Sequence, residues 1–203
     1  ALIELDENCV CSAVFTQSSF AAAPVLISRE HLKDESCRYL LVNSGNANAA
    51  TGNEGLENAI RCCESVAEMA GLKKEEVLPF STGVIGEPLN YQKIRNAIPS
   101  LFKKLAEDGW VDVAQAIVTT DTTIKISSTE IEVGDKAVRI TGVAKGSGMI
   151  QPNMATMLSF LATDALIDRK VLDQILSEVC EKTFNRITVD GDTSTSDTVF
   201  VST

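Results

Sequence analysis

The chain has 203 residues, of which 44 % are hydrophobic and 23 % charged, a globular composition that excludes a disordered protein. Its 18 basic and 28 acidic residues give a formal net charge of −10, so we expect no nucleic-acid partner. The apolar runs are far shorter than the roughly 20 residues of a membrane span. The composition therefore predicts a cytoplasmic protein that binds no membrane.

Cysteine and histidine limit the chemistry that this chain can perform. The six cysteines include no C-x-x-C pair, so we expect reduced thiols in the core and no metal site. His31 is the one histidine, and the pattern around it predicts the start of a polar surface helix. Acid–base groups other than histidine are therefore expected, and no cofactor is implied.

In the first half of the chain, alternating apolar residues predict strands at 1–5, 10–16 and 39–42. The segment 43–52 follows, with only small and amide residues, which allow a close approach of the backbone. Asn53 is expected to cap a helix that ends near Gly71. Its apolar positions have a helical period: Leu56, Ile60, Cys63, Ala67 and Ala70.

The middle of the chain follows the segment 81–86. A helical stripe of Ile94, Ile98, Leu101 and Leu105 is expected to be divided by Pro99. A short helix is expected at 112–116. Residues 124–133 and 138–143 alternate and predict a hairpin, and a glycine-rich loop at 144–154 leads into an apolar strand at 155–163.

The last part of the chain predicts a helix at 168–182, a strand at 185–189, a polar loop at 190–198 and a strand from 199. The helix is expected to bury four apolar residues: Leu172, Ile175, Leu176 and Val179. Strands and helices are mixed without strict alternation, which predicts an α/β or α+β fold with layered helices on mixed sheets.

Several polar segments have alternative interpretations. Backbone N–H groups at Thr82-Gly83 can form an oxyanion hole, although an ordinary glycine turn is the more common use of such a pair. The hydroxyls of 119–123 suit a solvated turn as well as a site. The order of Lys145-Gly146-Ser147-Gly148 is reversed from that of a phosphate loop, and 190–198 lacks the spacing of a calcium loop.

Thr156 offers a way to perform nucleophilic chemistry without histidine. A threonine that becomes an N-terminal residue can use its own freed amine as the base. Cleavage after Ala155 would create such a residue. The chain contains many threonines, and residue chemistry alone does not select this one.

The segment from Lys145 to Leu158 resembles the self-cleavage segment of the ornithine acetyltransferase (glutamate N-acetyltransferase) family of arginine biosynthesis. Four more segments resemble the family in the same order: 43–52, 81–86, 116–122 and 190–198. The resemblance implies self-cleavage between Ala155 and Thr156 and a nucleophilic Thr156. It further implies an N-terminal-threonine nucleophile fold and an acyltransferase that needs no cofactor.

The remaining roles also follow from the resemblance. Thr82 and Gly83 match the oxyanion-hole pair, and Thr119 and Lys145 match substrate-binding positions, with Thr156 itself contacting substrate. An acetyl group would pass from N-acetylornithine to Thr156 and then to glutamate. Residues 1–155 would form an alpha region and 156–203 the opening of a truncated beta region, within a heterotetramer or larger assembly.

Three alternatives to this activity remain. The same nucleophile could pass its acyl group to water, as in an amidohydrolase or aminopeptidase. The enzyme could also be bifunctional and accept acetyl-CoA as a donor. Family members are about twice this length, so the chain by itself could be an inactive fragment that lacks the rest of the site.

Overall fold

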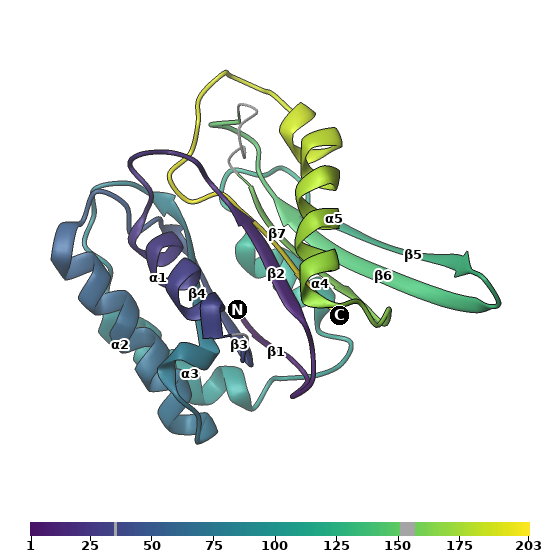
Figure 1. Ribbon diagram of the computed structural model, residues 1–203. Helices are drawn as coiled ribbons and strands as arrows, with labels where there is room; N and C mark the ends of the chain where they lie inside the picture. Colours follow the sequence, from purple (N-terminus) through teal and green to yellow (C-terminus); the bar gives the residue numbers. More distant parts are fainter. Residues whose placement is uncertain (35, 151–156) are drawn as a thin grey trace.

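The computed structural model describes residues 1–34, 36–150 and 157–203 and contains two sheets (Figure 1). The first sheet has three strands in the order β1-β3-β4: β1 (Leu2–Glu4), β3 (Tyr39–Asn46) and β4 (Val77–Val84). β3 pairs with β4 in parallel and with β1 antiparallel. The carboxyl ends of β3 and β4 therefore lie at the same edge of this sheet.

The second sheet has five strands in the order β2-β8-β7-β6-β5. These are β2 (Cys11–Phe15), β5 (Lys125–Val133), β6 (Lys136–Lys145), β7 (Leu158–Thr163) and β8 (Thr198–Ser202). β7 and β8 are parallel, and the other pairs are antiparallel. Both sheets are thus mixed, and β7 is the middle strand of the second.

Five α-helices surround the sheets in the described residues: α1 (Ala23–His31), α2 (Gly52–Ala70), α3 (Tyr91–Phe102), α4 (Trp110–Ile117) and α5 (Arg169–Lys182). Short 3₁₀ turns occur at Leu32–Asp34, Lys74–Glu76 and Phe184–Arg186. α1, α2 and α3 lie beside the first sheet, whereas α5 packs against β2 of the second (Figure 1).

The alternation of side chains along β3 explains why this strand is buried on both faces. In β3, Leu40 and Val42 belong to the core between the two sheets, whereas Tyr39 and Leu41 belong to the core beneath α2 and α3. Successive side chains of a strand point to opposite faces, so each apolar residue of β3 enters one of two cores. A strand that is buried on both faces needs this continuous apolar run.

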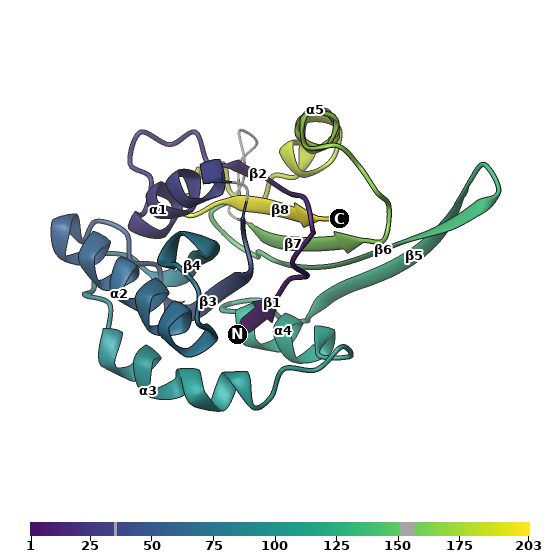
Figure 2. The same cartoon turned by 60° about the horizontal axis from the view of Figure 1, so that its bottom comes forward.

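In the second sheet, β7 and β8 are largely buried, and β8 contributes to the cores on both faces of the sheet. Phe200 of β8 faces the first sheet, and its neighbour Val199 contacts the α5 cluster. The centroid of the Phe80 ring lies 5.1 Å from that of Phe160 and 6.4 Å from that of Phe200. The order of layers is thus helices, first sheet, second sheet and α5 (Figure 2). The predicted layered fold on mixed sheets is confirmed.

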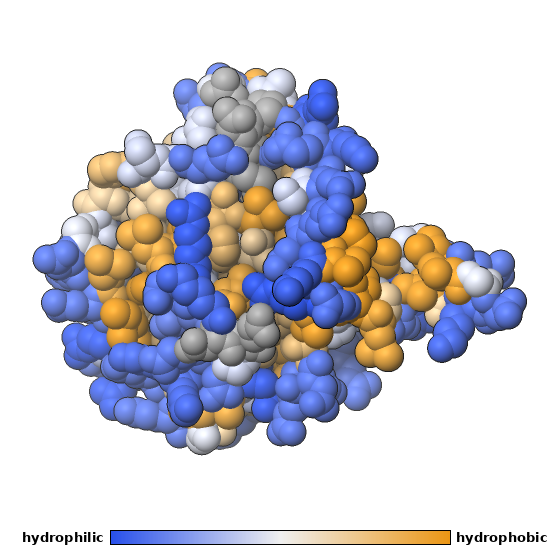
Figure 3. Space-filling model, in the orientation of Figure 1, coloured by the Kyte–Doolittle hydropathy of each residue, from blue (hydrophilic) through white to orange (hydrophobic). Residues whose placement is uncertain are grey.

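Part of the structure extends beyond these layers. The β5–β6 hairpin projects from the body of the molecule (Figures 1 and 2), and every residue of β5 is exposed. Ile126, Ile131 and Val133 on it are 40–58 % exposed. Apolar surface is visible along this hairpin and beside α5 (Figure 3). None of the helices in the described part is long and apolar enough to cross a membrane.

Several sequence expectations are wrong. Asn53 does not cap α2, because the helix begins at Gly52 and its N-cap residue is Thr51. Pro99 lies inside α3 instead of dividing it. The neighbouring Ile98 is buried in the core beneath α2 and α3, which holds this turn of the helix in place. His31 ends α1, is buried and bonds through Nδ1 to the Val77 carbonyl at 2.8 Å. The predicted strand at 185–189 is absent from the described structure, and a 3₁₀ turn and a loop occupy its place. The expectation that the cysteines lie mostly in the core is confirmed, since five of the six are buried.

Candidate functional site

The parallel pairing of β3 with β4 joins two of the segments identified in the sequence. Ser44 pairs with Thr82 and Gly45 with Gly83. Gly83 has φ +131°, and a Cβ atom there would lie 2.3 Å from the backbone carbon of Gly45. A side chain at position 83 would therefore collide with backbone. Only glycine allows these two segments to lie so close together.

Lys145 ends β6 and reaches this edge of the first sheet. Its side chain is buried, with the residue 5 % exposed. The Nζ atom donates hydrogen bonds to Thr82 Oγ1 at 2.8 Å and to Thr119 Oγ1 at 3.4 Å. The structure thus brings together three residues that the sequence analysis selected, from β4, from the loop after α4 and from β6.

The loop after α4 is fixed on both sides. Ser44 Oγ donates to the Ala116 carbonyl at 2.8 Å, which ties α4 to β3. Asp121 Oδ1 accepts the Gly146 N–H at 2.8 Å. Although burial alone would raise the pKa of Asp121, hydrogen bonds from Lys125 and from backbone amides hold it below its usual value. Asp121 is therefore a carboxylate that orders the backbone next to Lys145.

The charge of Lys145 is only partly compensated. Burial lowers the pKa of its ammonium group, and the nearby carboxyls of Asp121 and Asp197 oppose this shift. Within the described residues, the ammonium group donates hydrogen bonds to two neutral hydroxyls. A buried ammonium group gains most from an anionic partner. This position therefore suits a ligand that carries a carboxylate.

The middle strand of the second sheet starts beside Lys145. Leu158, the first residue of β7, pairs with Lys145 on one side and with Thr198 on the other. Ala155 and Thr156 lie outside the described residues, so the structure gives no position for the predicted nucleophile or for the predicted cleavage bond. The first residue of β7 nevertheless lies next to Lys145. We call Lys145, Thr82 and Thr119 the Lys145 cluster.

Sequence reasoning did not identify two acidic residues that contact the flanks of 151–156. Asp190 accepts hydrogen bonds from the backbone N–H groups of Met149 and Ile150, and Asp197 accepts one from Met157. The sequence offered two signals for 190–198: its resemblance to a family segment, and an alternation of Asp and hydroxyl residues that lacks the spacing of a calcium loop. Neither signal assigned a role to Asp190 or Asp197. Over the described ranges, no group of three potential metal ligands is present.

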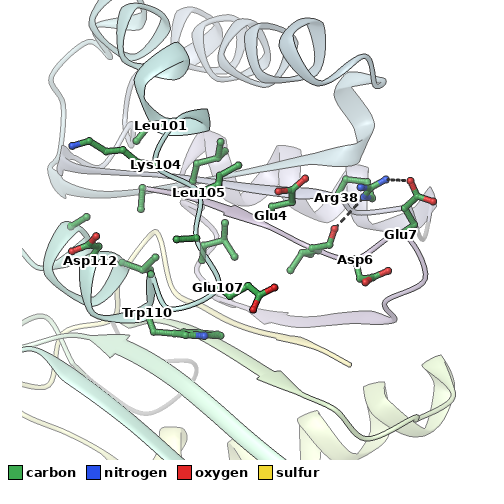
Figure 4. A pocket seen from close by; sticks show the side chains of 18 residues that line it. Glu4, Asp6, Glu7, Arg38, Leu101, Lys104, Leu105, Glu107, Trp110 and Asp112 are labelled. Atoms are coloured by element: carbon green, nitrogen blue, oxygen red, sulfur yellow. Dashed lines mark hydrogen bonds and ion pairs between the residues drawn. The ribbon is translucent and has the colours of Figure 1, made fainter.

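A separate cavity of about 800 Å³ lies between β1 and the helices α3 and α4 (Figure 4). Acidic side chains such as Glu4, Glu107 and Asp112 line it together with Arg38 and Lys104. Thr82, Thr119 and Lys145 are not among its lining residues. The cavity is therefore distinct from the Lys145 cluster.

Comparison with known proteins identifies relatives over the whole chain. The family model described as the ArgJ family matches residues 1–203. The arginine biosynthesis bifunctional protein ArgJ of Methylococcus capsulatus is 55 % identical over 196 residues, which cover 97 % of this chain and 48 % of that protein. The chain thus spans about half the length of the curated relatives that it matches.

Two solved structures share this fold. The arginine biosynthesis bifunctional protein argJ of Bacillus halodurans aligns with a TM-score of 0.63 and 31 % identity, covering 76 % of this chain and 98 % of that one. Ornithine acetyltransferase of Mycobacterium tuberculosis, solved in complex with ornithine, aligns with a TM-score of 0.66 and 26 % identity. The alignment covers 77 % of this chain and 82 % of that chain.

Proposed function

Because the chain belongs to the ArgJ family, we propose that it forms part of a cytoplasmic acyltransferase of arginine biosynthesis. The reaction transfers an acetyl group from N-acetylornithine to glutamate through an acetyl-threonine intermediate at Thr156. The M. tuberculosis relative was solved with ornithine bound, which supports ornithine as the released product. The enzyme is made of alpha and beta regions that stay associated, in a heterotetramer or larger assembly.

One observation carries this proposal. The ammonium group of Lys145 contacts the hydroxyls of Thr82 and Thr119, and Lys145 pairs across the sheet with Leu158, two residues after Thr156. The proximity of Lys145, Thr82 and Thr119 to the start of β7 supports the proposal. Both substrates carry an α-carboxylate, which is the group that the partly compensated Lys145 charge favours.

The enzyme first cuts its own chain. The Thr156 hydroxyl attacks the carbonyl carbon of Ala155, and the peptide C–N bond breaks as the nitrogen gains a proton and becomes the free α-amine. Water then hydrolyses the resulting ester, which leaves a carboxylate on Ala155 and a free hydroxyl on Thr156. The cut makes residues 1–155 a separate alpha polypeptide and makes 156–203 the start of the beta polypeptide, and the two stay associated.

The transfer then uses the new α-amine as the base. It accepts the proton of the Thr156 hydroxyl as the oxygen attacks the acetyl carbonyl of N-acetylornithine. Backbone N–H groups at Thr82 and Gly83 stabilise the negative charge on that carbonyl oxygen. The proton passes to the departing amine, ornithine leaves, and the amine of glutamate takes the acetyl group by the same steps in reverse.

The intact mass of the full-length protein under denaturing conditions tests the cut. We expect two species for the wild type, divided between Ala155 and Thr156, and one species for Thr156→Ala. Thr163→Ala is the matched control, because Thr163 is the last residue of β7 and, among the described residues, its hydroxyl accepts the Ala165 N–H. An uncut wild type that still transfers acetyl groups would rule out the threonine mechanism.

A product assay separates acetyl transfer from hydrolysis. With N-acetylornithine and glutamate together, we expect acetylglutamate and ornithine in equal amounts. Release of free acetate regardless of glutamate would instead identify an amidohydrolase. Replacing N-acetylornithine by acetyl-CoA in the same assay determines whether the enzyme is bifunctional.

A further inference from the structure

The loop 190–198 contacts the chain immediately before the segment 151–156. Asp190 Oδ2 accepts the Met149 N–H at 2.5 Å, and Oδ1 accepts the Ile150 N–H at 2.8 Å. Met149 has φ +57°, a left-handed conformation that is uncommon for a residue with a side chain. The carboxylate therefore holds a turn that an isolated chain of this sequence would rarely adopt.

The same loop contacts the chain immediately after that segment. Asp197 Oδ1 accepts the Met157 N–H at 2.8 Å, and the Thr198 N–H donates to the Met157 carbonyl at 2.9 Å. Asp197 and Thr198 are each 1 % exposed. Both polar backbone groups of Met157 are thus fixed by two consecutive residues in the protein interior.

The loop is itself attached to the body of the protein. Thr16 Oγ1 donates to the Ser194 carbonyl at 2.7 Å, and the Thr16 N–H donates to the Asp197 carbonyl at 2.8 Å. The Ala22 N–H donates to the Thr195 carbonyl at 2.8 Å, next to the start of α1. These hydrogen bonds fix the position of the loop that carries Asp190 and Asp197.

We propose that Asp190 and Asp197 are a pair of positioning residues for self-cleavage, which fix the chain on both sides of the Ala155–Thr156 bond. This inference rests on the proposed function and adds to it the residues that prepare the precursor. Neither carboxylate contacts the reacting atoms through any described interaction. They act through the backbone of Met149, Ile150 and Met157.

The physical basis is the entropy of bringing the hydroxyl to the carbonyl. An intramolecular attack becomes fast only when the reacting atoms are held about 3 Å apart in a favourable orientation. Fixing both ends of a short segment restricts the conformations that it can sample. Loss of either attachment is expected to slow the cut while the rest of the fold is retained.

The two aspartates differ in how they use their oxygens, which gives a sharp test. Asp190 accepts the Met149 amide through Oδ2 and the Ile150 and Asp192 amides through Oδ1, and asparagine supplies only one acceptor oxygen. Asp197 holds Met157 through Oδ1. Its buried Oδ2 makes no hydrogen bond of normal geometry to the described residues, although the hydroxyl and the N–H of Ser194 lie close enough to lower the pKa of this carboxyl. Asparagine at 197 can therefore still hold Met157.

The experiment follows the cut in the full-length protein by intact mass over time after synthesis. Relative to the wild type, we expect Asp190→Ala, Asp190→Asn and Asp197→Ala to slow the cut by about tenfold or more, because each removes at least one hydrogen bond to a backbone amide beside the segment. Asp197→Asn should cut at a rate close to that of the wild type. Asp192→Asn is the matched control, because it removes the same charge from an exposed position of the same loop.

Circular dichroism confirms that each variant is folded at the temperature of the assay. If Asp197→Ala does not fold, the exposed Asp190 carries the test through its alanine and asparagine variants. Equal rates for wild type, Asp190→Ala and Asp190→Asn would overturn the inference and leave the proposed function intact. Asp197→Asn as slow as Asp197→Ala would overturn positioning through Oδ1. A wild type that never cuts would overturn the proposed function together with this inference.

Discussion

Lys145 is the residue where stability and function are most directly opposed. Its ammonium group is buried and donates to two neutral hydroxyls. Replacing a buried charge by an apolar side chain of similar volume is often neutral or stabilising. The same charge is available to a substrate carboxylate in the proposed reaction. A single substitution can therefore separate the two contributions.

We expect Lys145→Met to leave the free energy of unfolding unchanged or to raise it by up to about 2 kcal/mol. It should also lower kcat/KM for N-acetylornithine by roughly 100-fold or more, since a charge-assisted contact is lost. Urea unfolding and steady-state kinetics of the full-length protein measure the two effects. Lys136→Met, on the exposed start of β6, is the control. Full activity of Lys145→Met would contradict a substrate role.

Asp197 makes stability depend on pH. Burial raises the pKa of its carboxyl group to about 8 from an ordinary value of 3.8, and the Met157 N–H and the Lys145 ammonium oppose this only in part. The unfolded chain loses this proton near pH 4, but the folded chain keeps it until about pH 8. The contribution to stability is therefore full below pH 3.8 and is lost as the pH rises to 8.

We expect Asp197→Asn to remove this dependence. Between pH 5 and 8, the free energy of unfolding of the wild type should fall relative to the variant, with a limiting slope of about 1.4 kcal/mol per pH unit for one proton. Urea unfolding at several pH values, in a Thr156→Ala background that stays uncut, measures the difference. Parallel curves for the two proteins would show that Asp197 is ionised throughout this range.

The sequence predicted only some of the residues of the candidate site. Thr82, Thr119 and Lys145 were selected by resemblance, but their proximity depends on parallel pairing and on the stacking of two sheets. No local pattern encodes either of these. Asp190 and Asp197 bind backbone amides, and every residue except proline offers such a donor. The residue types at the bound positions therefore do not indicate which amides the two carboxylates bind.

Among the elements, α5 shows what helical periodicity can and cannot predict. The helix predicted at 168–182 agrees with α5 to within one residue, and Asp168 caps it by accepting the Lys170 N–H at 2.9 Å. Of the four residues expected to face inward, Leu172 and Leu176 are buried, whereas Ile175 and Val179 are each 44 % exposed. The periodicity of the sequence therefore predicted a wider apolar face of α5 than the strip that β2 and β8 cover.

The difference in burial between Leu176 and Ile175 predicts that aspartate at these adjacent positions will destabilise the protein to different extents. Leu176→Asp places a carboxylate in the cluster with Cys180 and Val199 and should cost about 3 kcal/mol or more of unfolding free energy. Ile175→Asp should change it by less than about 1 kcal/mol in this 203-residue chain. Urea denaturation of both variants gives the comparison. Equal losses would mean that both faces of the helix are covered.

The predicted strand at 185–189 failed for a reason that lies outside its own sequence. Ile187 and Val189 alternate as in a strand, yet they are 43 % and 60 % exposed. The Val189 N–H donates to the Ile150 carbonyl at 2.9 Å, so this backbone supports the loop before 151–156. An alternating pattern gives a strand only where a sheet edge is available.

For the whole molecule, composition and element order predicted layered mixed sheets but not the partition of strands. β1 and β2 are neighbours in sequence, yet β1 joins the first sheet and β2 the second. Pairing of sequential strands is a common tendency, and here the apolar faces decide otherwise. Leu2 enters the core beneath α2, and Cys11 enters the core between the sheets.

The strand order of the second sheet has a consequence for the proposed cut. β7 and β8 follow the bond between 155 and 156, and they lie between β2 and β6, which precede it. The two products would therefore remain joined by hydrogen bonds along both sides of this pair. We expect them to elute together in native chromatography and to separate only in denaturant.

Self-cleavage would also change the molecularity of folding. An uncut Thr156→Ala chain should show a thermal midpoint independent of its concentration, whereas the midpoint of the cut protein should rise with concentration, because two polypeptides must associate. Differential scanning fluorimetry across a hundredfold dilution series measures this. A concentration-independent midpoint after the cut would contradict the interleaved arrangement. Maturation would thus convert a chain that refolds alone into two halves that must find each other by diffusion.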